Sequence, residues 1–443
     1  MKKYLTIFAG ALLMAACNND AEDIAGNSNG YQPSTDAIAF EVEQQGVQNS
    51  TTRALGEIYD DAALQTKEIG VFASYTGKLK YENTTVSPDF MWNQRLAYAS
   101  GEWTYNPVKY WPNTIDGANR VEYVSFFAYA PYEASPADDG TKCIIDLSAN
   151  NVNGDPWLNY RLAKYPWPKD ETGADVTPNQ VDLLYGTKRI GDTAPYIYEP
   201  WTNVTNWNDA KTAKVYGEGK KVKFTMKHAL ASIGNEIKIS ISQEMADLIR
   251  NYSRIDVTGI KIVYKNLTNK ARLVLNSADG SANWKEIISG ELTTSRTYVN
   301  MFASTSIIKF DGTKWETGTA VNNYTDGDDA NRTEITYLNT TTDVNSGKIG
   351  DGLFYIPLQI AGTEKPQAEV TLYYKVWINA LNNYIATTPD PAEAKSTIDL
   401  NINDMEGKQQ GLLLILGKDF DLMHEVWTLG GTATEPSYSR ITK

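Results

Sequence analysis

Residues suited to acid–base catalysis, metal binding or nucleophilic attack are scarce in this sequence. The two histidines, His228 and His424, lie far apart along the chain. No G-x-S-x-G motif places a nucleophilic serine, and no C-x-x-C or H-E-x-x-H motif places a zinc ion. Asp and Glu are abundant, but no spacing selects a pair of the kind that a glycosidase uses. We therefore expect no enzymatic activity, no cofactor and no metal, and structural or surface positions for both histidines.

One turn gathers oxygen ligands, namely Asp326-Gly327-Asp328-Asp329-Ala330-Asn331. Calcium binding needs such oxygens, but the segment lacks the glycine at the sixth and the glutamate at the twelfth position of an EF-hand. Asp, Asn and Gly are also the ordinary residues of turns. We expect a solvated acidic turn, and calcium binding at Asp326–Asp329 stays an open alternative.

The N-terminus carries a different kind of chemistry. Lys2 and Lys3 precede an apolar run, Tyr4–Ala16, that is too short to span a bilayer and is typical of a signal peptide. The run ends in Leu13-Met14-Ala15-Ala16-Cys17, which resembles a bacterial lipobox, where the cysteine thiol is acylated. Residues 1–17 are therefore predicted to be a lipoprotein signal peptide, with Cys17 as the lipidated residue. The acidic stretch Asn18–Asp23 is similar to the surface-export signal of Bacteroidales-type lipoproteins, which implies the outer membrane and the cell surface.

The composition narrows the class of protein. A length of 443 residues suggests two or three compact units, and 42% hydrophobic residues suffice for sizeable cores. The net charge of -13 argues against a nucleic-acid partner. The 27 Tyr and 11 Trp favour half-buried strands. Cys143 is expected to be an unpaired thiol, partly buried in a strand, because the only other cysteine lies in the signal peptide.

The pattern of apolar residues predicts an all-β chain. Ala37–Glu43 alternates so that Ile38, Phe40 and Val42 share one face of a strand. A short helix is expected at Gln243–Arg250, with Ser242 as its N-cap and with Met245, Leu248 and Ile249 on a common apolar face. The other predicted strands are Glu68–Tyr75, Gly101–Tyr105, Val121–Tyr132, Val222–Met226, Ile237–Ile241, Ile255–Tyr264, Leu273–Leu275, Leu353–Ile360, Ala368–Trp377 and Leu412–Leu416.

Four tryptophans, Trp157, Trp167, Trp201 and Trp207, are expected on the irregular segments 150–180 and 186–219. Their rings are suited to stacking on sugars of a glycan. The favoured interpretation is that these rings pin loops against a sandwich, because tryptophan buries a large apolar area. A boundary between two domains is placed within residues 186–219.

Several short sequence segments, taken together and in order, resemble those of the fimbrillin family of Bacteroidales, the lipoprotein precursors of type V pili. They are Ser50-Thr51-Thr52-Arg53-Ala54, Ile69-Gly70-Val71-Phe72-Ala73, Trp103-Thr104-Tyr105 with Tyr110-Trp111-Pro112, Val124–Tyr132, Val181-Asp182-Leu183-Leu184-Tyr185 and Val222–Leu230. The resemblance runs from the lipobox to about His228 and thins afterwards.

This resemblance implies two transthyretin-like β-sandwich domains in tandem, which we place at residues 54–205 and 206–443. Residues 18–53 would form a tether and a removable N-terminal strand containing Ile38, Phe40 and Val42. A trypsin-like protease would cut between Arg53 and Ala54, and other fimbrillin subunits would then join by donor-strand exchange. The implied location is the outer membrane surface before processing and the fimbrium, or pilus, afterwards, with cell adhesion to a host or bacterial surface glycan or protein receptor as its role.

Alternatives remain open at this point. The tail after Trp427 is a poor donor strand, so a tip or accessory position competes with a stalk position. Arg53 is also compatible with an ordinary linker arginine. A surface lipoprotein that keeps its lipid anchor and binds glycans through its Trp-bearing loops is the alternative function.

Overall fold

The computed structural model of this protein describes part of the chain. The described residues are 37–44, 61–77, 87–110, 123–162, 181–188, 201–204, 221–242, 244–245, 248, 253–276, 281–287, 293–310, 315–317, 323–326, 333–336, 353–403 and 405–429. Strands dominate these segments, and the all-β prediction is confirmed. None of the described helices is long and apolar enough to cross a membrane.

The N-terminal sheet has eight strands in the order β2-β3-β4-β1-β10-β8-β5-β9, and β2 also pairs with β5. This additional pairing closes seven of them, all except β9, into a ring of paired strands, which we call the N-terminal ring. The strands are β1 (Phe40–Gln44), β2 (Ile69–Gly77), β3 (Met91–Ala99), β4 (Glu102–Thr104), β5 (Tyr123–Ala130), β8 (Leu184–Lys188), β9 (Trp201–Val204) and β10 (Val222–His228).

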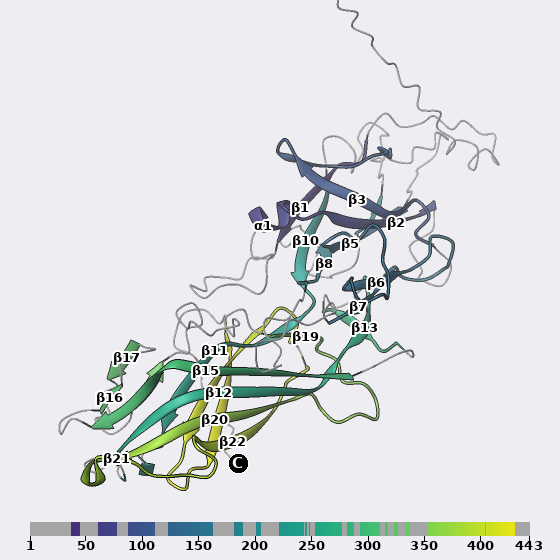
Figure 1. The fold of residues 1–443 in the computed structure, drawn as a ribbon. Coiled ribbons are helices and arrows are strands. Elements are labelled where there is room, and N and C mark those ends of the chain that lie inside the picture. The colour runs from purple at the N-terminus through teal and green to yellow at the C-terminus, as the bar shows by residue number, and fades with distance from the viewer. Residues whose placement is uncertain are drawn as a thin grey trace, which may run out of the picture.

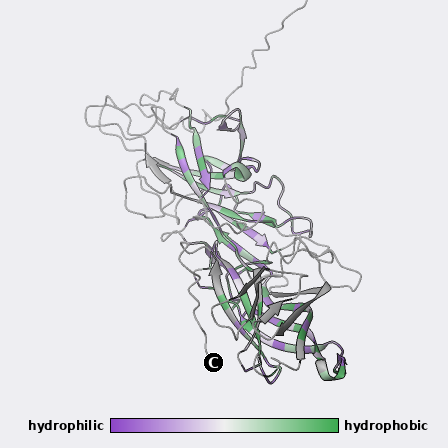
Figure 2. Cartoon of the chain, turned by 90° about the vertical axis from the view of Figure 1, so that its left-hand side faces the viewer, coloured by the Kyte–Doolittle hydropathy of each residue, from purple (hydrophilic) through white to green (hydrophobic). Residues whose placement is uncertain are grey.

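The N-terminal ring encloses its own apolar core. Alternate residues of a strand point to opposite faces, so Val71 of β2 and Phe126 of β5 lie in the core of the ring. Phe72 and Phe127, their neighbours in sequence, lie in a second core that extends into the rest of the chain. Banding of polar and apolar residues along the strands is visible in Figure 2. Both faces of these two strands are therefore buried in part.

A four-stranded linking sheet lies between the N-terminal ring and the lower body in Figure 1. Its order is β14-β13-β7-β6, with β6 (Ile144–Leu147), β7 (Trp157–Arg161), β13 (Lys270–Val274) and β14 (Asn283–Lys285). The pairings β7–β13 and β8–β10 each join residues on opposite sides of the boundary expected at residues 205 and 206. The domain limits 54–205 and 206–443, and the tandem of transthyretin-like sandwiches, stay predictions.

Two six-stranded sheets make up the lower body of Figure 1. One has the order β17-β18-β11-β23-β24, with β19 also on β11, and the other β16-β15-β12-β20-β21, with β22 also on β20. Ile260 of β12 and Leu412 of β23 belong to one apolar cluster, so the two sheets share a core as the layers of a sandwich do. The strands of the first sheet are β11 (Ala231–Ile241), β17 (Asn323–Asp326), β18 (Thr333–Thr336), β19 (Leu353–Tyr355), β23 (Gln409–Leu416) and β24 (Leu422–Leu429). Those of the second are β12 (Ser253–Thr268), β15 (Thr293–Phe310), β16 (Trp315–Thr317), β20 (Gln367–Ile378), β21 (Asn383–Tyr384) and β22 (Ala392–Asp399).

Helical structure is sparse in the described residues. The elements are the helix α1 (Asp61–Gln65) and the 3-10 helix η3 (Asn379–Leu381), and Glu244, Met245 and Leu248 are also helical. The backbone N–H of Met245 donates to Ser242 Oγ over 3.1 Å, as expected for an N-cap. Met245 is buried, but Leu248 is 55% exposed, so the expected common buried face is wrong for Leu248. Side chains three positions apart on a helix differ by about 60° in direction around its axis. Here that difference places Met245 in the core and Leu248 outside it.

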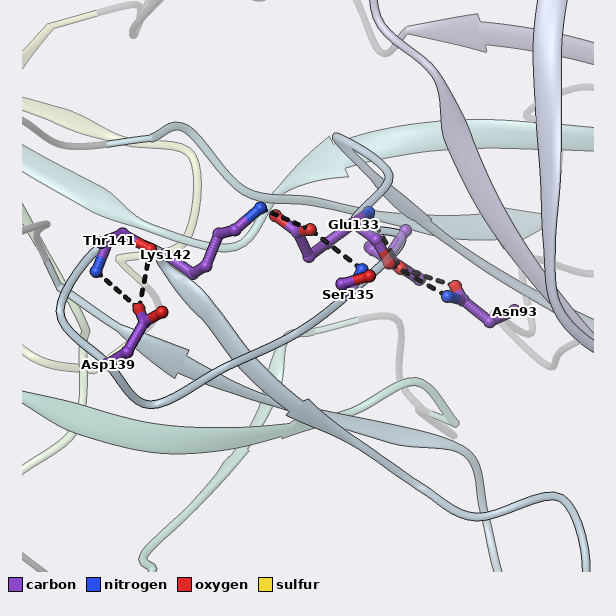
Figure 3. A network of polar contacts seen from close by, with 7 residues as sticks. Asn93, Glu133, Ser135, Asp139, Thr141 and Lys142 are labelled. Carbon is purple, nitrogen blue, oxygen red and sulfur yellow. Dashed lines mark hydrogen bonds and ion pairs between the residues drawn. The ribbon is translucent and has the colours of Figure 1, made fainter.

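A polar network holds the segment between β5 and β6 against β3 (Figure 3). The Tyr129 hydroxyl donates to Asn93 Oδ1 over 2.7 Å and accepts from the backbone N–H of Glu133 over 3.3 Å. Asn93 Nδ2 donates to the Glu133 carbonyl over 3.0 Å, and Lys142 Nζ donates to Glu133 Oε1 over 2.8 Å. Burial raises the pKa of Tyr129, so its hydroxyl keeps the proton that it donates.

Candidate functional site

Strand β1 lies between β4 and β10 and completes the N-terminal ring (Figure 1). It runs parallel to β10, with Phe40 opposite Val222 and Val42 opposite Phe224. It meets β4 in the antiparallel sense, through Phe40 opposite Trp103. The strand predicted at Ala37–Glu43 is present but spans Phe40–Gln44, and Ala37 is joined to Tyr110 by an isolated bridge. Among the described strands, β1 alone separates β4 from β10.

The three residues predicted to share a face of this strand are all buried. Ile38, Phe40 and Val42 are 2%, 1% and 7% exposed, and they belong to the core of the N-terminal ring. Burying each such side chain stabilises the fold by about 1.5–3 kcal/mol. The intervening Glu41 lies on the other face, with 41% of its side chain exposed and its carboxylate 3.8 Å from Lys223 Nζ. Strand β1 is therefore amphipathic and presents its apolar face to the core.

Aromatic rings surround Phe40. Its ring centroid lies 5.4 Å from that of Tyr105 and 5.9 Å from that of Phe126, both edge to face, and 6.2 Å from that of Phe224, with the planes nearly parallel. These are the separations at which aromatic pairs attract each other beyond simple burial. We call the place that β1 fills, lined by Trp103, Tyr105, Phe126, Val222 and Phe224, the β1 groove.

The backbone of β1 and of the residues before it is hydrogen-bonded on both sides. The N–H of Ile38 donates to the Lys109 carbonyl over 2.9 Å, and the N–H of Val222 donates to the Ala39 carbonyl over 2.7 Å. The Tyr105 hydroxyl donates to the Ile38 carbonyl over 2.8 Å. Burial raises the pKa of Tyr105 to about 12, so this hydroxyl remains a donor at neutral pH. Removal of the strand would leave several such groups without partners in an apolar groove.

The C-terminal end of β1 is polar rather than apolar. Gln44 is 7% exposed, and its Nε2 lies 2.9 Å from Nε2 of His228, the last residue of β10. On the other side of the imidazole, His228 Nδ1 lies 3.1 Å from Oδ1 of Asp182, which is 3% exposed. His228 is thus a buried structural histidine, as expected. Sequence reasoning missed its partners, although Asp182 among the apolar residues of Val181–Tyr185 was a signal for a buried polar contact.

The predicted lipidation site, Cys17, and the predicted processing site, Arg53 and Ala54, lie outside the described residues. The described chain stops at Gln44 and resumes at Asp61, and these two residues are in contact. The backbone N–H of Gln44 donates to Asp61 Oδ1 over 2.5 Å, and Leu64 of α1 is fully buried in the core of the ring. Both ends of the segment that contains Arg53 are therefore anchored beside the β1 groove.

The four tryptophans considered for glycan binding differ in where they lie in the fold. Trp157 lies in β7 and Trp201 in β9, so the expectation of irregular segments is wrong for both, because short strands form between the turn residues. Trp167 and Trp207 lie outside the described residues, and for Trp201 only the strand backbone is described.

Trp157 lines a pocket of about 330 Å³, together with Ser148, Asp155, Arg272, Lys285 and Glu286. The guanidinium carbon of Arg272 lies 3.6 Å from the centroid of the Trp157 ring, so one ring face is covered by a cation. Arg272 Nε donates to Asn159 Oδ1 over 3.0 Å, which holds it there. A sugar could stack on this face of Trp157 only by displacing Arg272.

The other candidate residues lie on separate elements in the described part of the chain. His424 Nδ1 lies 2.7 Å from Ser396 Oγ, on a different sheet from His228. Asp326 ends β17, and residues 327–332 are outside the described ranges. No group of three or more His, Cys, Asp or Glu that could hold a metal ion occurs among the described residues. Cys143 is buried directly before β6 rather than within a strand.

Part of the chain is similar in sequence to a known fimbrial subunit. The chain is 35% identical over 95 residues to the fimbrium subunit Fim1C of Phocaeicola vulgatus. The match covers 21% of this chain and 23% of the relative, so the chain spans less than a quarter of that relative's length. No protein-family model matches the chain.

Solved structures of low identity align over most of the chain. A fimbrial protein from Bacteroides vulgatus has a TM-score of 0.49 at 21% identity, with 90% of this chain and 100% of that chain covered. A candidate cell adhesion protein from Bacteroides uniformis has a TM-score of 0.32 at 13% identity, with 90% and 100% covered. These likenesses are weak, and the fold is assigned from the strand pairings above. The sequence match supports the predicted resemblance: over those 95 residues the chain is similar to a fimbrial subunit of the Bacteroidales.

Proposed function

We propose that this chain is a subunit of a surface fimbrium, with a structural rather than an enzymatic role in cell adhesion. It is exported as a lipoprotein through Cys17, cut between Arg53 and Ala54, and joined to other subunits by donor-strand exchange. The observation that carries the proposal is the position of β1. This strand fills the gap between β4 and β10, and it belongs to the segment that the cut would detach.

The energetics of the groove support exchange rather than simple loss of the strand. Ile38, Phe40 and Val42 are all buried in the core of the ring, each worth about 1.5–3 kcal/mol. An empty groove would also expose unpaired backbone groups on β4 and β10. A strand from another subunit restores both kinds of contact by β-augmentation.

The C-terminal end does not decide between a stalk and a tip position. Strand β23 is buried between β11 and β24, so Leu412–Leu416 is a core strand and a poor candidate for donation. Strand β24 pairs along its whole length with β23, and residues 430–443 lie outside the described part. A stalk subunit donates a strand, whereas a tip or accessory subunit only accepts one.

The experiment uses the chain from Asn18 to Lys443 and its Arg53→Gln variant, each treated with trace trypsin. Mass spectrometry maps the cut, and gels run without heating detect ladders of polymers. A cut at Arg53 followed by ladders, both absent from the Arg53→Gln variant, supports a stalk subunit. A clean cut without ladders favours a tip or accessory position, and resistance at Arg53 under conditions that cut other exposed sites contradicts the proposal.

A second candidate function, glycan binding by a lipid-anchored surface protein, is favoured by the pocket beside Trp157. Its volume of about 330 Å³ lies within the range of small-molecule pockets, and it combines an aromatic ring with Arg272 and Lys285. Glycan-array binding that is lost in Trp157→Ala, in a chain that stays uncut at Arg53, would favour this function over the first.

A further inference from the structure

The end of the β1 groove near Gln44 differs chemically from the rest of it. Phe40, Val42 and Gln44 alternate along β1 and are all buried, so the amide of Gln44 enters the interior on the same side as the two apolar side chains. It meets His228 rather than an apolar residue. The groove therefore has three apolar positions, at Ile38, Phe40 and Val42, followed by one polar position.

The polar position has a defined direction of hydrogen bonding. In the neutral imidazole, the carboxylate of Asp182 accepts from Nδ1–H of His228, and this contact selects the tautomer in which Nε2 carries a lone pair. Nε2 then accepts a hydrogen bond from the amide Nε2–H of Gln44, with 2.9 Å between the two nitrogens. What the groove requires at this position is a neutral hydrogen-bond donor.

His228 and Asp182 stay behind when the N-terminal segment leaves. His228 ends β10, and Asp182 lies two residues before β8, so both belong to the retained part of the chain. They are 6% and 3% exposed with β1 in place. A strand with a leucine at this position would fill the space but leave the lone pair of the imidazole unsatisfied. A strand with a glutamate would bring a second carboxylate toward Asp182.

We propose that His228, held by Asp182, selects the incoming strand by requiring a side-chain carboxamide at the position that Gln44 now occupies. The partner is a β-strand of another subunit that runs parallel to β10, with apolar residues at three alternate positions and Gln or Asn at the next one. This inference depends on the proposed exchange of β1. It adds that the groove distinguishes among strands of equal hydrophobicity.

The test uses the full chain with a specific protease site in place of residues 49–53, cut and then freed of its N-terminal segment in mild denaturant. Fluorescein-labelled peptides that copy residues 37–46 are titrated against it, and their Kd values are measured by anisotropy. The series comprises the native peptide and its Gln44→Leu and Gln44→Glu forms. The control peptide is Glu41→Gln, an amide-for-acid change on the exposed face of the strand.

We expect Gln44→Leu and Gln44→Glu to bind at least about 10-fold more weakly than the native peptide, as the loss of one buried hydrogen bond implies. Glu41→Gln should bind within about threefold, as is usual for an exposed ion pair. In a His228→Phe protein the order of the native and Gln44→Leu peptides should reverse. Equal binding of these two peptides to the unsubstituted protein overturns the selection by His228 while leaving strand exchange intact. Failure of the native peptide to bind at all overturns both.

Discussion

The ring of Phe40 lies almost parallel to that of Phe224, at an interplanar angle of 7° and a centroid separation of 6.2 Å, although 184 positions separate the two residues in sequence. Phe40 belongs to the segment that a cut after Arg53 would detach, and Phe224 belongs to the part that would remain. The contact thus places the predicted detachable strand within the core of the N-terminal ring. Exchange of this strand would replace core contacts rather than surface contacts.

Truncation of Phe40 should weaken the N-terminal ring strongly. Phe40→Ala removes a ring that is 1% exposed, together with its contacts to three aromatic neighbours. We therefore expect the free energy of unfolding to fall by about 3–5 kcal/mol. Urea unfolding of the uncut chain measures this change. Glu41→Ala, on the exposed face of the same strand, is the control and should cost at most about 1 kcal/mol. Equal effects of the two substitutions would show that β1 is not a core strand.

Gly70 should tolerate no side chain. A Cβ at this position would lie 2.2 Å from Cε1 of Tyr129, whose ring is fixed by its hydroxyl contact with Asn93. We therefore expect Gly70→Ala to destabilise the fold by at least about 1–3 kcal/mol. Thermal unfolding gives the measurement, with Ala99→Ser at an exposed position of β3 as the control. A Gly70→Ala variant as stable as the parent would mean that Tyr129 is free to move.

Tyr105 should make the stability of the ring sensitive to alkaline pH. Its pKa is raised from 10.0 to about 12 in the folded chain, so its favourable contribution is complete below pH 10 and is lost as the pH rises through 12. The free energy of unfolding is compared between the parent and Tyr105→Phe from pH 8 to 12. The parent should be the more stable at pH 8, and its advantage should shrink above pH 10. A difference that stays constant over this range would contradict the burial of the hydroxyl.

The pocket beside Trp157 should be dispensable for assembly. It lies at β7 of the linking sheet, and none of its lining residues lines the β1 groove. We expect Trp157→Ala to leave the cut at Arg53 and the uptake of a donor strand unchanged, whatever it does to glycan binding. Loss of strand uptake in this variant, with the fold intact by circular dichroism, would couple the two sites.

The sequence predicted those features of the fold that depend on the pattern of neighbouring residues. The alternation of Ile38, Phe40 and Val42 gave the strand and its buried face correctly, and Ser242 was recognised as a helix cap. Pairing between distant segments has no local signal, so the insertion of β1 between β4 and β10 could not be read from the chain. The same holds for β13, which pairs with β7 across the expected domain boundary. The contact between Gln44 and His228 was missed for this reason, because each looks like an ordinary polar residue until the two strands meet.

The removable nature of β1 is tested most directly by locking it in place. Glu41 and Lys223 are opposite each other in the parallel pair of β1 and β10, on the exposed face, so Glu41→Cys with Lys223→Cys should form a disulfide across the two strands. The oxidised variant is cut at Arg53 and mixed with the labelled peptide that copies residues 37–46. Strand exchange predicts a cut chain that retains its N-terminal segment, takes up no peptide while oxidised, and takes it up after reduction. Uptake of the peptide by the oxidised, cut chain would contradict the assignment of the β1 groove as the docking site.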